Sequence, residues 1–568
     1  MADTWSAEQL DNPRIPLPKV DELNRYYWTG GERGELCFLR CVDCGTYLHP
    51  PAPVCPQCHS TSVAPSAVSG LGYLLTFTIN RQQWVPDVEP PYAVGVIELP
   101  EQPGLRVTTS LVGLELDDIE IGMALRVAFV PRDDVWIPVF TSTDETPAPR
   151  PDPPLPPHTR PRRAPRTIGE RAAVISGSGQ SAVGRRLYRH PLDLTVEASL
   201  QAIRAAGLTT DDIDGISTYP GAAEVSPGLS GVGVFDVKDA LRLEVDWFSG
   251  GSEAPGQFGS ILNACAAVAA GYANHVLCFR TVWESSAQGN SGRQAVVGVK
   301  GNDDATPARV TGLMQWLMPY AIPSAASWLA LNARRHFHEF GTTREQLGWI
   351  AVVQRAHAAL NPVAIYRDPM TIDDYLTARL ISDPLCLFDC DVPCDGSTAF
   401  VISRSDAAAD LRRPPIAINA ASGAFWGRPS WDQFDDLTTM ALRDAAQGLW
   451  QRTELTPGDV DVAELYDGFS FTTLAWIEAL GFCARGEGGP FVEGGARIAL
   501  DGELPLNTHG GQLSAGRLHG YGFLHEACAQ LWGDGGARQV VRDGGRRPEV
   551  AIAAAGGGPY AAAMLLTR

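Results

Sequence analysis

Short runs of alternating or β-branched residues follow one another in the N-terminal quarter of the chain, separated by Pro, Gly and Asp turns. Alternation with a period of two is typical of half-buried strands, and closely spaced strands of this kind are typical of a small antiparallel barrel. We therefore predict four strands, which Trp136–Phe140 would close into a five-stranded barrel. The four runs are Tyr73–Asn80, Tyr92–Leu99, Arg106–Gly113 and Met123–Val130.

Helix-like and strand-like segments alternate in the remaining four hundred or so residues, and their order occurs twice. In each copy an apolar helical face is followed by a short acidic turn and a strand-like run; the turns are LTTDDID at 208–214 and LTPGDVD at 455–461. Each copy also has a Gly-Gly pair before an Ala-rich helical stretch and a further strand, at Gly250–Gly251 and at Gly510–Gly511. This repeat predicts two similar α/β halves packed against each other.

A proline-rich segment, Thr141–Arg166, separates the barrel from the repeat. Neither a helix nor a central strand persists in such a segment, so we predict an extended, semi-rigid spacer that tethers two modules. The expected organisation is an N-terminal helix and metal-binding ribbon at 1–65, a barrel at 66–140, a linker at 141–167, and a catalytic region at 168–568 with halves at about 168–405 and 406–568.

The bulk composition excludes several classes of function. Of the 568 residues, 45% are hydrophobic and 19% are charged, as in an ordinary globular protein. The net charge of -20 argues against a nucleic-acid partner, because phosphate repels an acidic surface. No segment approaches the ~20 consecutive apolar residues of a membrane span, and the N-terminus does not resemble a secretion signal. We expect no nucleic-acid or membrane partner and a cytoplasmic location.

Four of the twelve cysteines form two CxxC knuckles, Cys41 with Cys44 and Cys55 with Cys58. Each knuckle is short enough to place both thiolates on one ion, and the loop between them can close a tetrahedral site. The alternative is two coincidental pairs of unligated thiols, which have few other uses in a reducing compartment. Because four thiolates leave no open coordination position, we predict a structural Zn²⁺ ion.

The segment from Tyr26 to Phe140 resembles the zinc-ribbon/OB-fold family that accompanies acyl-CoA-processing, thiolase-like proteins, although only the cysteine quartet is specific within it. The segment from Arg171 to Arg568 resembles the thiolase superfamily, with AAVISGSGQS at the first strand, DGSTAFVISRSDAA at the end of the first half and the tail AAAGGGPYAA. The most similar branch contains lipid-transfer-type thiolases and related non-thiolytic steroid aldolases. The resemblance implies an α/β fold of thiolase-like duplicated αβαβα layers, preceded by the zinc ribbon and an antiparallel OB-fold barrel.

The residues that carry out thiolase chemistry are replaced in this chain. The nucleophilic cysteine of a thiolase follows the first Gly-Gly pair, where this chain has SEAPG at 252–256. The segment GHPxG, which carries the general-base histidine, corresponds to GRLHG at 516–520, and the second cysteine corresponds to Ala553–Ala555. Cys265 lies further along the first helix, where we expect a small buried apolar residue, since a reactive thiolate needs an exposed, electropositive setting.

Two tyrosines occupy loops that carry reacting groups in thiolases: Tyr466 in LYDGF and Tyr521 in NTHGGQLSAGRLHGYG. They resemble the tyrosine pair of the steroid-degrading aldolases, and a phenol of pKa ~10 can exchange protons with an alkoxide if its site adjusts that value. The alternative is that both only pack at loop junctions. His509 and His519 are candidates for polarising a thioester oxygen, because a neutral imidazole donates one hydrogen bond.

The glycines of the same segment, Gly510, Gly511 and Gly520, are expected to allow strained turns and close approach of the pantetheine arm of CoA. Asp467 is expected either to orient the neighbouring tyrosine or to cap the following helix, and we favour the cap.

The resemblance and the substitutions together favour a retro-aldolase that cleaves a β-hydroxyacyl-CoA into a ketone and a shorter acyl-CoA. By resemblance, the substrate is a steroid side-chain CoA ester of the 17-hydroxy-20-carboxyl type, which gives a 17-ketosteroid and propionyl-CoA. CoA is then part of the substrate, and a homodimer formed by the thiolase-like region is expected. Two alternatives stay open: a thiolase or Claisen-type acyltransferase, and a non-catalytic acyl-CoA-binding scaffold.

Overall fold

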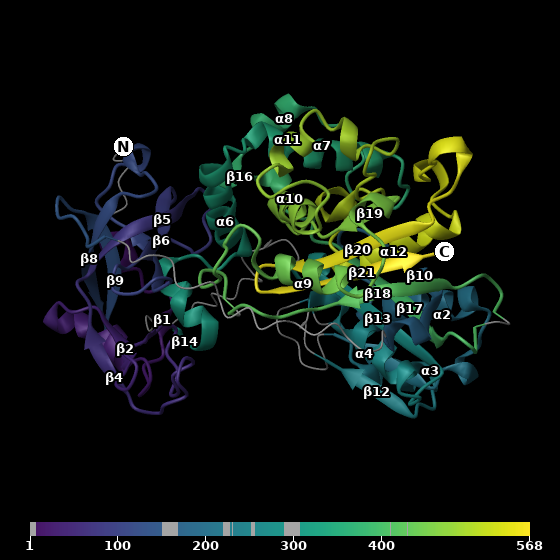
Figure 1. The fold of residues 1–568 in the computed structure, drawn as a ribbon, viewed down its shortest axis with the longest axis horizontal. Coiled ribbons are helices and arrows are strands. Elements are labelled where there is room, and N and C mark those ends of the chain that lie inside the picture. The colour runs from purple at the N-terminus through teal and green to yellow at the C-terminus, as the bar shows by residue number, and fades with distance from the viewer. Residues whose placement is uncertain are drawn as a thin grey trace.

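The computed structural model describes residues 7–149, 169–219, 228–229, 231–251, 256–288, 307–408, 411–428 and 430–568. A β-rich module at one end of the molecule is joined to a larger α/β module (Figure 1). Within the described residues, no helix is long and apolar enough to cross a membrane.

The β-rich module contains a ribbon and a barrel. The ribbon is a three-stranded antiparallel sheet in the order β3-β2-β4, preceded by the short helix α1. The barrel closes because β5 pairs with β6 along one edge and with β8 along the other. These strands confirm the predicted barrel. Their bounds are Cys37–Cys41 (β2), Tyr47–Leu48 (β3), Val63–Ala67 (β4), Leu71–Asn80 (β5), Tyr92–Glu98 (β6), Arg106–Leu111 (β7), Ala124–Arg132 (β8) and Val135–Ser142 (β9), with α1 at Arg25–Thr29.

The α/β module is built on a nine-stranded sheet in the order β12-β11-β13-β17-β10-β18-β21-β20-β19. The strands β10 and β18 pair near its centre, and the pattern repeats outward from them: two antiparallel neighbours and then a parallel one. This duplication confirms the two predicted halves. The bounds are Ala173–Gln180 (β10), Gly215–Thr218 (β11), Trp247–Gly250 (β12), His275–Trp283 (β13), Asp395–Arg404 (β17), Ile416–Ser422 (β18), Val462–Leu465 (β19), Val550–Gly557 (β20) and Tyr560–Thr567 (β21).

The two acidic turns that revealed the repeat adopt the same local structure. Thr209 and Asp212 form a capping box in the first, and Thr456 and Asp459 form one in the second. In both, the threonine and aspartate satisfy backbone N–H groups before a strand begins. The two similar turn sequences therefore form the same capped turn before β11 and before β19.

Helices cover the sheet in layers. The helices α2 and α3 share one core with β13 and β17 of the first half. The helices α4 and α12 share a second core with strands of both halves, so they form the central layer. On the far face of the second half, α9 and α10 pack against β20 and β21. The bounds are Pro191–Ala206 (α2), Val234–Leu241 (α3), Gly259–Ala269 (α4), Met440–Trp450 (α9), Ser470–Ala479 (α10) and Gly520–Trp532 (α12).

An insertion between β13 and β17 connects the two modules. Its hairpin extends the barrel sheet, since Ser382 of β15 pairs with Asn80 of β5. Thr76 of the barrel donates a hydrogen bond to the Leu331 carbonyl of α6 at 2.6 Å, and both groups are buried. The modules therefore share a fixed contact as well as a tether. The inserted elements are Glu284–Gln288 (α5), Arg309–Val310 (β14, paired with β1 at Leu17–Pro18), Ala325–Phe340 (α6), Arg344–Ala359 (α7), Ile372–Leu376 (α8), Leu380–Ser382 (β15) and Leu385–Cys386 (β16); α11 at Gly488–Val492 lies later in the chain.

Candidate functional site

The four predicted zinc ligands lie together in the ribbon. Their sulfur atoms are all within 4.8 Å of one another, and the pairs Cys41–Cys58 and Cys44–Cys55 are 3.5 and 3.6 Å apart. A tetrahedral ion with Zn–S bonds of about 2.3 Å needs sulfur–sulfur distances of about 3.8 Å, so these thiolates fit a structural Zn²⁺ ion.

We expect Cys41→Ser to release this zinc, because the remaining three thiolates no longer close the coordination sphere. Metal analysis of the purified protein should give about one ion per chain for the wild type and a small fraction of that for the variant. The matched control is Cys37→Ser, which changes a buried cysteine of the same strand outside the cluster and should retain zinc. Full zinc content in Cys41→Ser would contradict the assignment.

Two loops of the α/β module bring the candidate tyrosines to the start of the central helix α4. Tyr466 directly follows β19, and its hydroxyl accepts a hydrogen bond from Gln257 Nε2 at 3.1 Å. Tyr521 lies in the first turn of α12, is fully buried, and places its hydroxyl 2.6 Å from Ser260 Oγ. Gln257 and Ser260 are on either side of the point where α4 begins at Gly259. Both phenolic hydroxyls therefore meet the same helix terminus.

Gln257 connects the two loops. Besides its bond to Tyr466, its Oε1 atom accepts a hydrogen bond from the backbone N–H of Gly520 at 2.6 Å, next to Tyr521. The N–H groups in the first turn of α4 have no partner within the helix and carry partial positive charge. The terminus of α4 thus favours an anion, such as a phenolate or an enolate, next to Gln257 and Ser260.

The surroundings of Tyr521 oppose and favour its phenolate form at the same time. Burial raises the pKa of Tyr521 well above its ordinary value, and Cys278 adds to this. The hydrogen bond to Ser260 and the guanidinium of Arg280 act in the opposite direction. Proton transfer at this phenol therefore depends on groups that compensate for burial.

His519 lies immediately before α12, two residues before Tyr521. Its Nδ1 atom is 3.3 Å from an Arg280 guanidinium nitrogen, and its backbone N–H donates to Gln512 Oε1 at 3.0 Å. Burial, assisted by Arg280 and Arg517, lowers the pKa of His519 well below its ordinary value, so the imidazole is neutral. Since arginine only donates hydrogen bonds, we infer that Nδ1 accepts and that Nε2 carries the proton. A neutral donor is the form that the sequence analysis requires; its role in catalysis stays a prediction.

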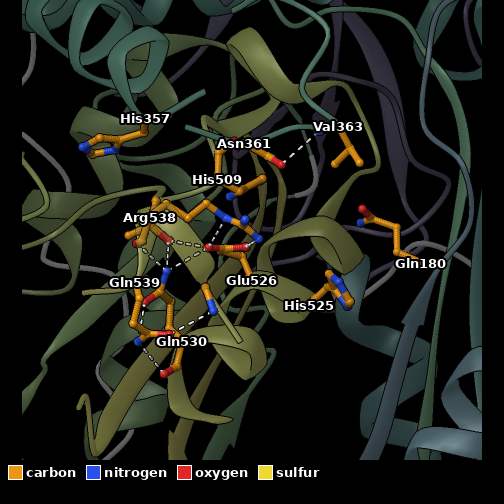
Figure 2. A network of polar contacts seen from close by, with 12 residues as sticks. Gln180, His357, Asn361, Val363, His509, His525, Glu526, Gln530, Arg538 and Gln539 are labelled. Carbon is orange, nitrogen blue, oxygen red and sulfur yellow. Dashed lines mark hydrogen bonds and ion pairs between the residues drawn. The ribbon is translucent and has the colours of Figure 1, made fainter. Parts of the chain in front are cut away.

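His509, the other candidate histidine, belongs to a separate buried network (Figure 2). Its Nδ1 atom is 3.1 Å from Glu464 Oε2, and this partner outweighs burial and raises the pKa of His509. Glu526 lies in the same network; although burial acts to raise its pKa, Arg538 holds it at about 2. His509 thus belongs to a buried cluster with Glu464, Glu526 and Arg538, whereas His519 contacts Arg280.

A small, largely enclosed cavity lies between these groups. Its lining includes His509, His519, His525, Gln180 and Asn361. Its volume is about 40 Å³. A water molecule needs roughly 10–15 Å³ by this measure, so the cavity accommodates about three waters. It is too small for an acyl-CoA.

The thiols near α4 are poorly suited to nucleophilic attack. Cys265 is buried on α4, and burial raises the pKa of its thiol to about 12. Cys278 is fully buried beside Ser260, and burial raises the pKa of its thiol well above the ordinary value. Residues 252–255, which contain the position of the thiolase nucleophile, lie outside the described residues. The strand at Ala553–Ala555, which corresponds to the second thiolase cysteine, is buried in β20.

Arg517 is a charged residue that the sequence analysis did not select. It stands where the sequence analysis placed the GHPxG segment, and its buried guanidinium forms ion pairs with Asp391, at 3.1 Å, and with Glu284. These carboxylates outweigh burial and raise the pKa of Arg517, and Tyr466 contributes in the same direction. The guanidinium is therefore within electrostatic reach of the Tyr466 hydroxyl.

Each of the three candidate glycines has a packing reason. Gly510 and Gly511 have φ values of +103° and +59°, and a Cβ on Gly511 would lie 1.9 Å from Asp467 Oδ2. A Cβ on Gly520 would lie 2.5 Å from the Ala555 side chain. Strained turns and close packing explain all three, and contact with CoA stays a prediction.

The expectation that Asp467 caps the following helix is wrong. The helix α10 begins without a side-chain cap, and Asp467 instead accepts a hydrogen bond from the Gln512 N–H at 2.8 Å in the turn Gly511–Ala515. Burial raises the pKa of Asp467 to about 7. Its carboxyl group fastens the loop that leads to Tyr521, because that turn has N–H groups without partners of their own.

The sequence motifs therefore select the two tyrosines as candidates but do not indicate the groups that hold them. Gln257, Ser260 and Arg280 were not selected, because a lone polar residue in an apolar stretch gives no motif. Polar residues around the start of the Ala-rich helix after Gly250–Gly251 are the one signal that could have found the first two.

Three parts of the chain match known families. Residues 28–64 match the family "ChsH2, rubredoxin-like zinc ribbon domain", and residues 66–130 match "ChsH2, C-terminal OB-fold domain". Residues 423–567 match "Thiolase C-terminal domain-like".

Two curated proteins are similar to nearly two thirds of the chain. A steroid side-chain-cleaving aldolase of Thermomonospora curvata is 36% identical over 376 residues, which are 64% of this chain and 90% of that protein. A 17-hydroxy-3-oxo-4-pregnene-20-carboxyl-CoA lyase of Mycobacterium tuberculosis is 34% identical over 64% of this chain and 92% of that protein. Among solved structures, one described as an Ltp2-ChsH2(DUF35) aldolase has a TM-score of 0.60 and 31% identity, covering 71% of this chain and 99% of that chain.

Proposed function

The chain belongs to the family of thiolase-like, steroid side-chain-cleaving aldolases, and we propose that it cleaves a β-hydroxyacyl-CoA by a retro-aldol reaction. The enzyme is a carbon–carbon lyase that acts on a CoA thioester. By similarity to its relatives, its substrate is a steroid side-chain ester of the 17-hydroxy-20-carboxyl-CoA type, and its products are a 17-ketosteroid and propionyl-CoA.

The reaction needs two proton transfers and no covalent intermediate. A base removes the proton of the β-hydroxyl group, the bond between the α- and β-carbons breaks, and the β-carbon becomes a ketone. The electron pair of that bond enters the thioester as an enolate, which an acid then protonates at the α-carbon. Hydrogen-bond donors hold the enolate oxygen meanwhile.

One observation carries the assignment to this site: the Tyr466 and Tyr521 hydroxyls bond to Gln257 and Ser260, on either side of the start of α4. Two proton-exchanging groups are then available at a helix terminus that favours negative charge. His519, which contacts Arg280 two residues before Tyr521, supplies a neutral donor. The glycines at 510, 511 and 520 hold the loops in place, and His509 stabilises the loop that carries them.

The arrangement supports a lyase over the two alternatives. A thiolase or Claisen-type enzyme needs a thiolate, and burial raises the pKa of Cys265 to about 12. A silent acyl-CoA-binding scaffold would not require several buried polar groups at one helix terminus, where each costs free energy unless it is paired.

We extend the proposal to the organisation of the chain. The boundaries at 65, 140 and 167, and the division near 405, follow from the repeat and the spacer. In this fused chain the ribbon and barrel remain packed on the catalytic module, as supported by the β5–β15 pairing. Reduced zinc thiolates suit a cytoplasmic location.

A homodimer is part of the proposal. β12 stands at the end of the described strand order and leaves one edge open. Phe248 on β12 and Phe235 on α3 expose 56% and 63% of their surface, with ring centroids 5.7 Å apart. Because an open edge with exposed aromatic rings favours self-association, light scattering of the purified protein should give twice the chain mass; a monomer would contradict this part.

The substrate class is tested by incubation with a panel of β-hydroxyacyl-CoA esters, with and without free CoA. We expect a ketone and a CoA ester shortened by the lost carbons, in equal amounts, from the steroid ester and at a rate independent of free CoA. A matched ester without the β-hydroxyl group should not react, because the first proton transfer is then impossible. Product formation that depends on free CoA would instead support thiolysis.

A further inference from the structure

Arg280 is a buried arginine in strand β13, on the same face of the strand as Cys278. Its residue surface is 3% exposed. One guanidinium nitrogen donates to the Thr281 carbonyl at 2.7 Å, a second faces His519 Nδ1 at 3.3 Å, and the group lies 5.0 Å above the ring centroid of Tyr219. Its Nε–H has no hydrogen-bond partner.

This arginine has no carboxylate partner among the described residues, in contrast to two partly buried arginines of the same region. Arg517 is paired with Glu284 and Asp391, and Arg538 is paired with Glu526. A buried guanidinium without a counter-charge is costly, because neither water nor a carboxylate offsets its desolvation.

The groups that face Arg280 and Tyr521 are all neutral in their ordinary forms. Cys278 comes from β13, Tyr219 follows β11, Ser260 comes from α4 and His519 precedes α12. Burial keeps the imidazole of His519 and the thiol of Cys278 uncharged. Among the described groups that face Arg280 and Tyr521, the only charge is therefore the positive charge of Arg280 itself.

We propose that Arg280 is a positioning residue that offsets the negative charge formed on the Tyr521 oxygen during proton transfer. When Tyr521 gives or takes a proton, its oxygen is a phenolate at one stage of the cycle, and Arg280 and the start of α4 are the positive groups beside it. Arg280 also orients His519 through the Nδ1 contact. This inference rests on the proposed function, because it assumes that Tyr521 exchanges a proton with the substrate.

The test is the pH profile of kcat for carbon–carbon cleavage in Arg280→Gln, Arg280→Lys and the wild type. One limb of the wild-type profile belongs to Tyr521 and is absent in Tyr521→Phe. Without the cation a phenolate is harder to form, so that limb should move to higher pH by about one unit in Arg280→Gln, equal to a tenfold change in the phenolate fraction at fixed pH. Arg280→Lys keeps the charge and should move it less.

Arg132→Gln is the matched control. Arg132 is also a buried arginine, but it binds backbone carbonyls in the β-rich module, far in sequence from α4. This control should be less stable than the wild type and have an unchanged pH profile. If Arg280→Gln does not fold, Arg280→Lys is compared with the wild type instead. Ultraviolet titration of tyrosinate, after subtraction of the Tyr521→Phe signal, then gives the shift in the Tyr521 titration without turnover.

The outcomes separate the two proposals. If the wild type forms no ketone from any ester, the proposed function fails. If the wild type is active and both Arg280 variants keep its pH profile, with only a uniform loss of rate, the inference about Arg280 is overturned and the proposed function stands.

Discussion

Tyr521→Phe should lower kcat for carbon–carbon cleavage by about 10²–10⁴-fold, the usual contribution of a general acid or base. The phenol at this position lies 2.6 Å from Ser260 Oγ, and phenylalanine has no proton to exchange there. Tyr466→Phe should cause a loss of the same order, because Tyr466 provides the second exchanging group at the same helix terminus. Steady-state rates with the steroid CoA ester measure both effects.

The control must separate lost chemistry from lost stability. Removing the Tyr521 hydroxyl leaves Ser260 without that partner and should cost about 1 kcal/mol of folding free energy. Tyr92→Phe removes another fully buried hydroxyl, which donates to the Ala321 carbonyl at the junction of the modules. It should lose similar stability while retaining kcat. Wild-type turnover in Tyr521→Phe would show that the phenol is only a packing group.

Gly256→Ala should destabilise the protein by several kcal/mol and also abolish cleavage. Gly256 has φ +59°, and a Cβ there would lie 2.7 Å from the Ala562 backbone nitrogen and 3.0 Å from the Ala555 backbone oxygen. Strain at positive φ alone costs roughly 1–3 kcal/mol, and strand backbone cannot yield as a side chain does. Any relief displaces Gln257, which binds the Tyr466 hydroxyl and the Gly520 N–H.

Gly341→Ala measures the cost of a positive φ without a steric clash. Gly341 has φ +74° at the end of α6, and nothing lies within 4 Å of an added Cβ. Chemical denaturation should therefore show a loss of about 1 kcal/mol for Gly341→Ala and a clearly larger loss for Gly256→Ala. Equal losses would mean that the contact of Gly256 with β20 and β21 has no energetic weight.

Patterns that depend on local spacing allowed the sequence to predict much of this fold. Period-two runs predicted the barrel strands to within a few residues, and paired acidic turns predicted the duplicated halves, because both arise from hydrogen bonds between near neighbours in the chain. The cysteine knuckles are local as well, since a CxxC spacing itself places two sulfur atoms on one ion.

The candidate site was predicted less completely because its contacts are not local. Gln257 binds Tyr466, which is 209 residues away, and Arg280 faces His519, which is 239 residues away. Neither Gln257 nor Arg280 belongs to a motif. Which side chains each of them contacts depends on how the two halves pack together. The role of Asp467 was mistaken for the same reason: its hydrogen bonds reach a turn 45 residues later instead of the adjacent helix.

Cleavage of the steroid CoA ester in D₂O without free CoA tests the central claim most directly, with mass spectrometry of both the products and the intact protein. If phenols exchange protons and no thiol attacks, the shortened acyl-CoA should carry a single deuterium at its α-carbon, and the protein should keep its unmodified mass throughout turnover. A protein mass increased by an acyl group, or an absolute requirement for free CoA, would contradict the account.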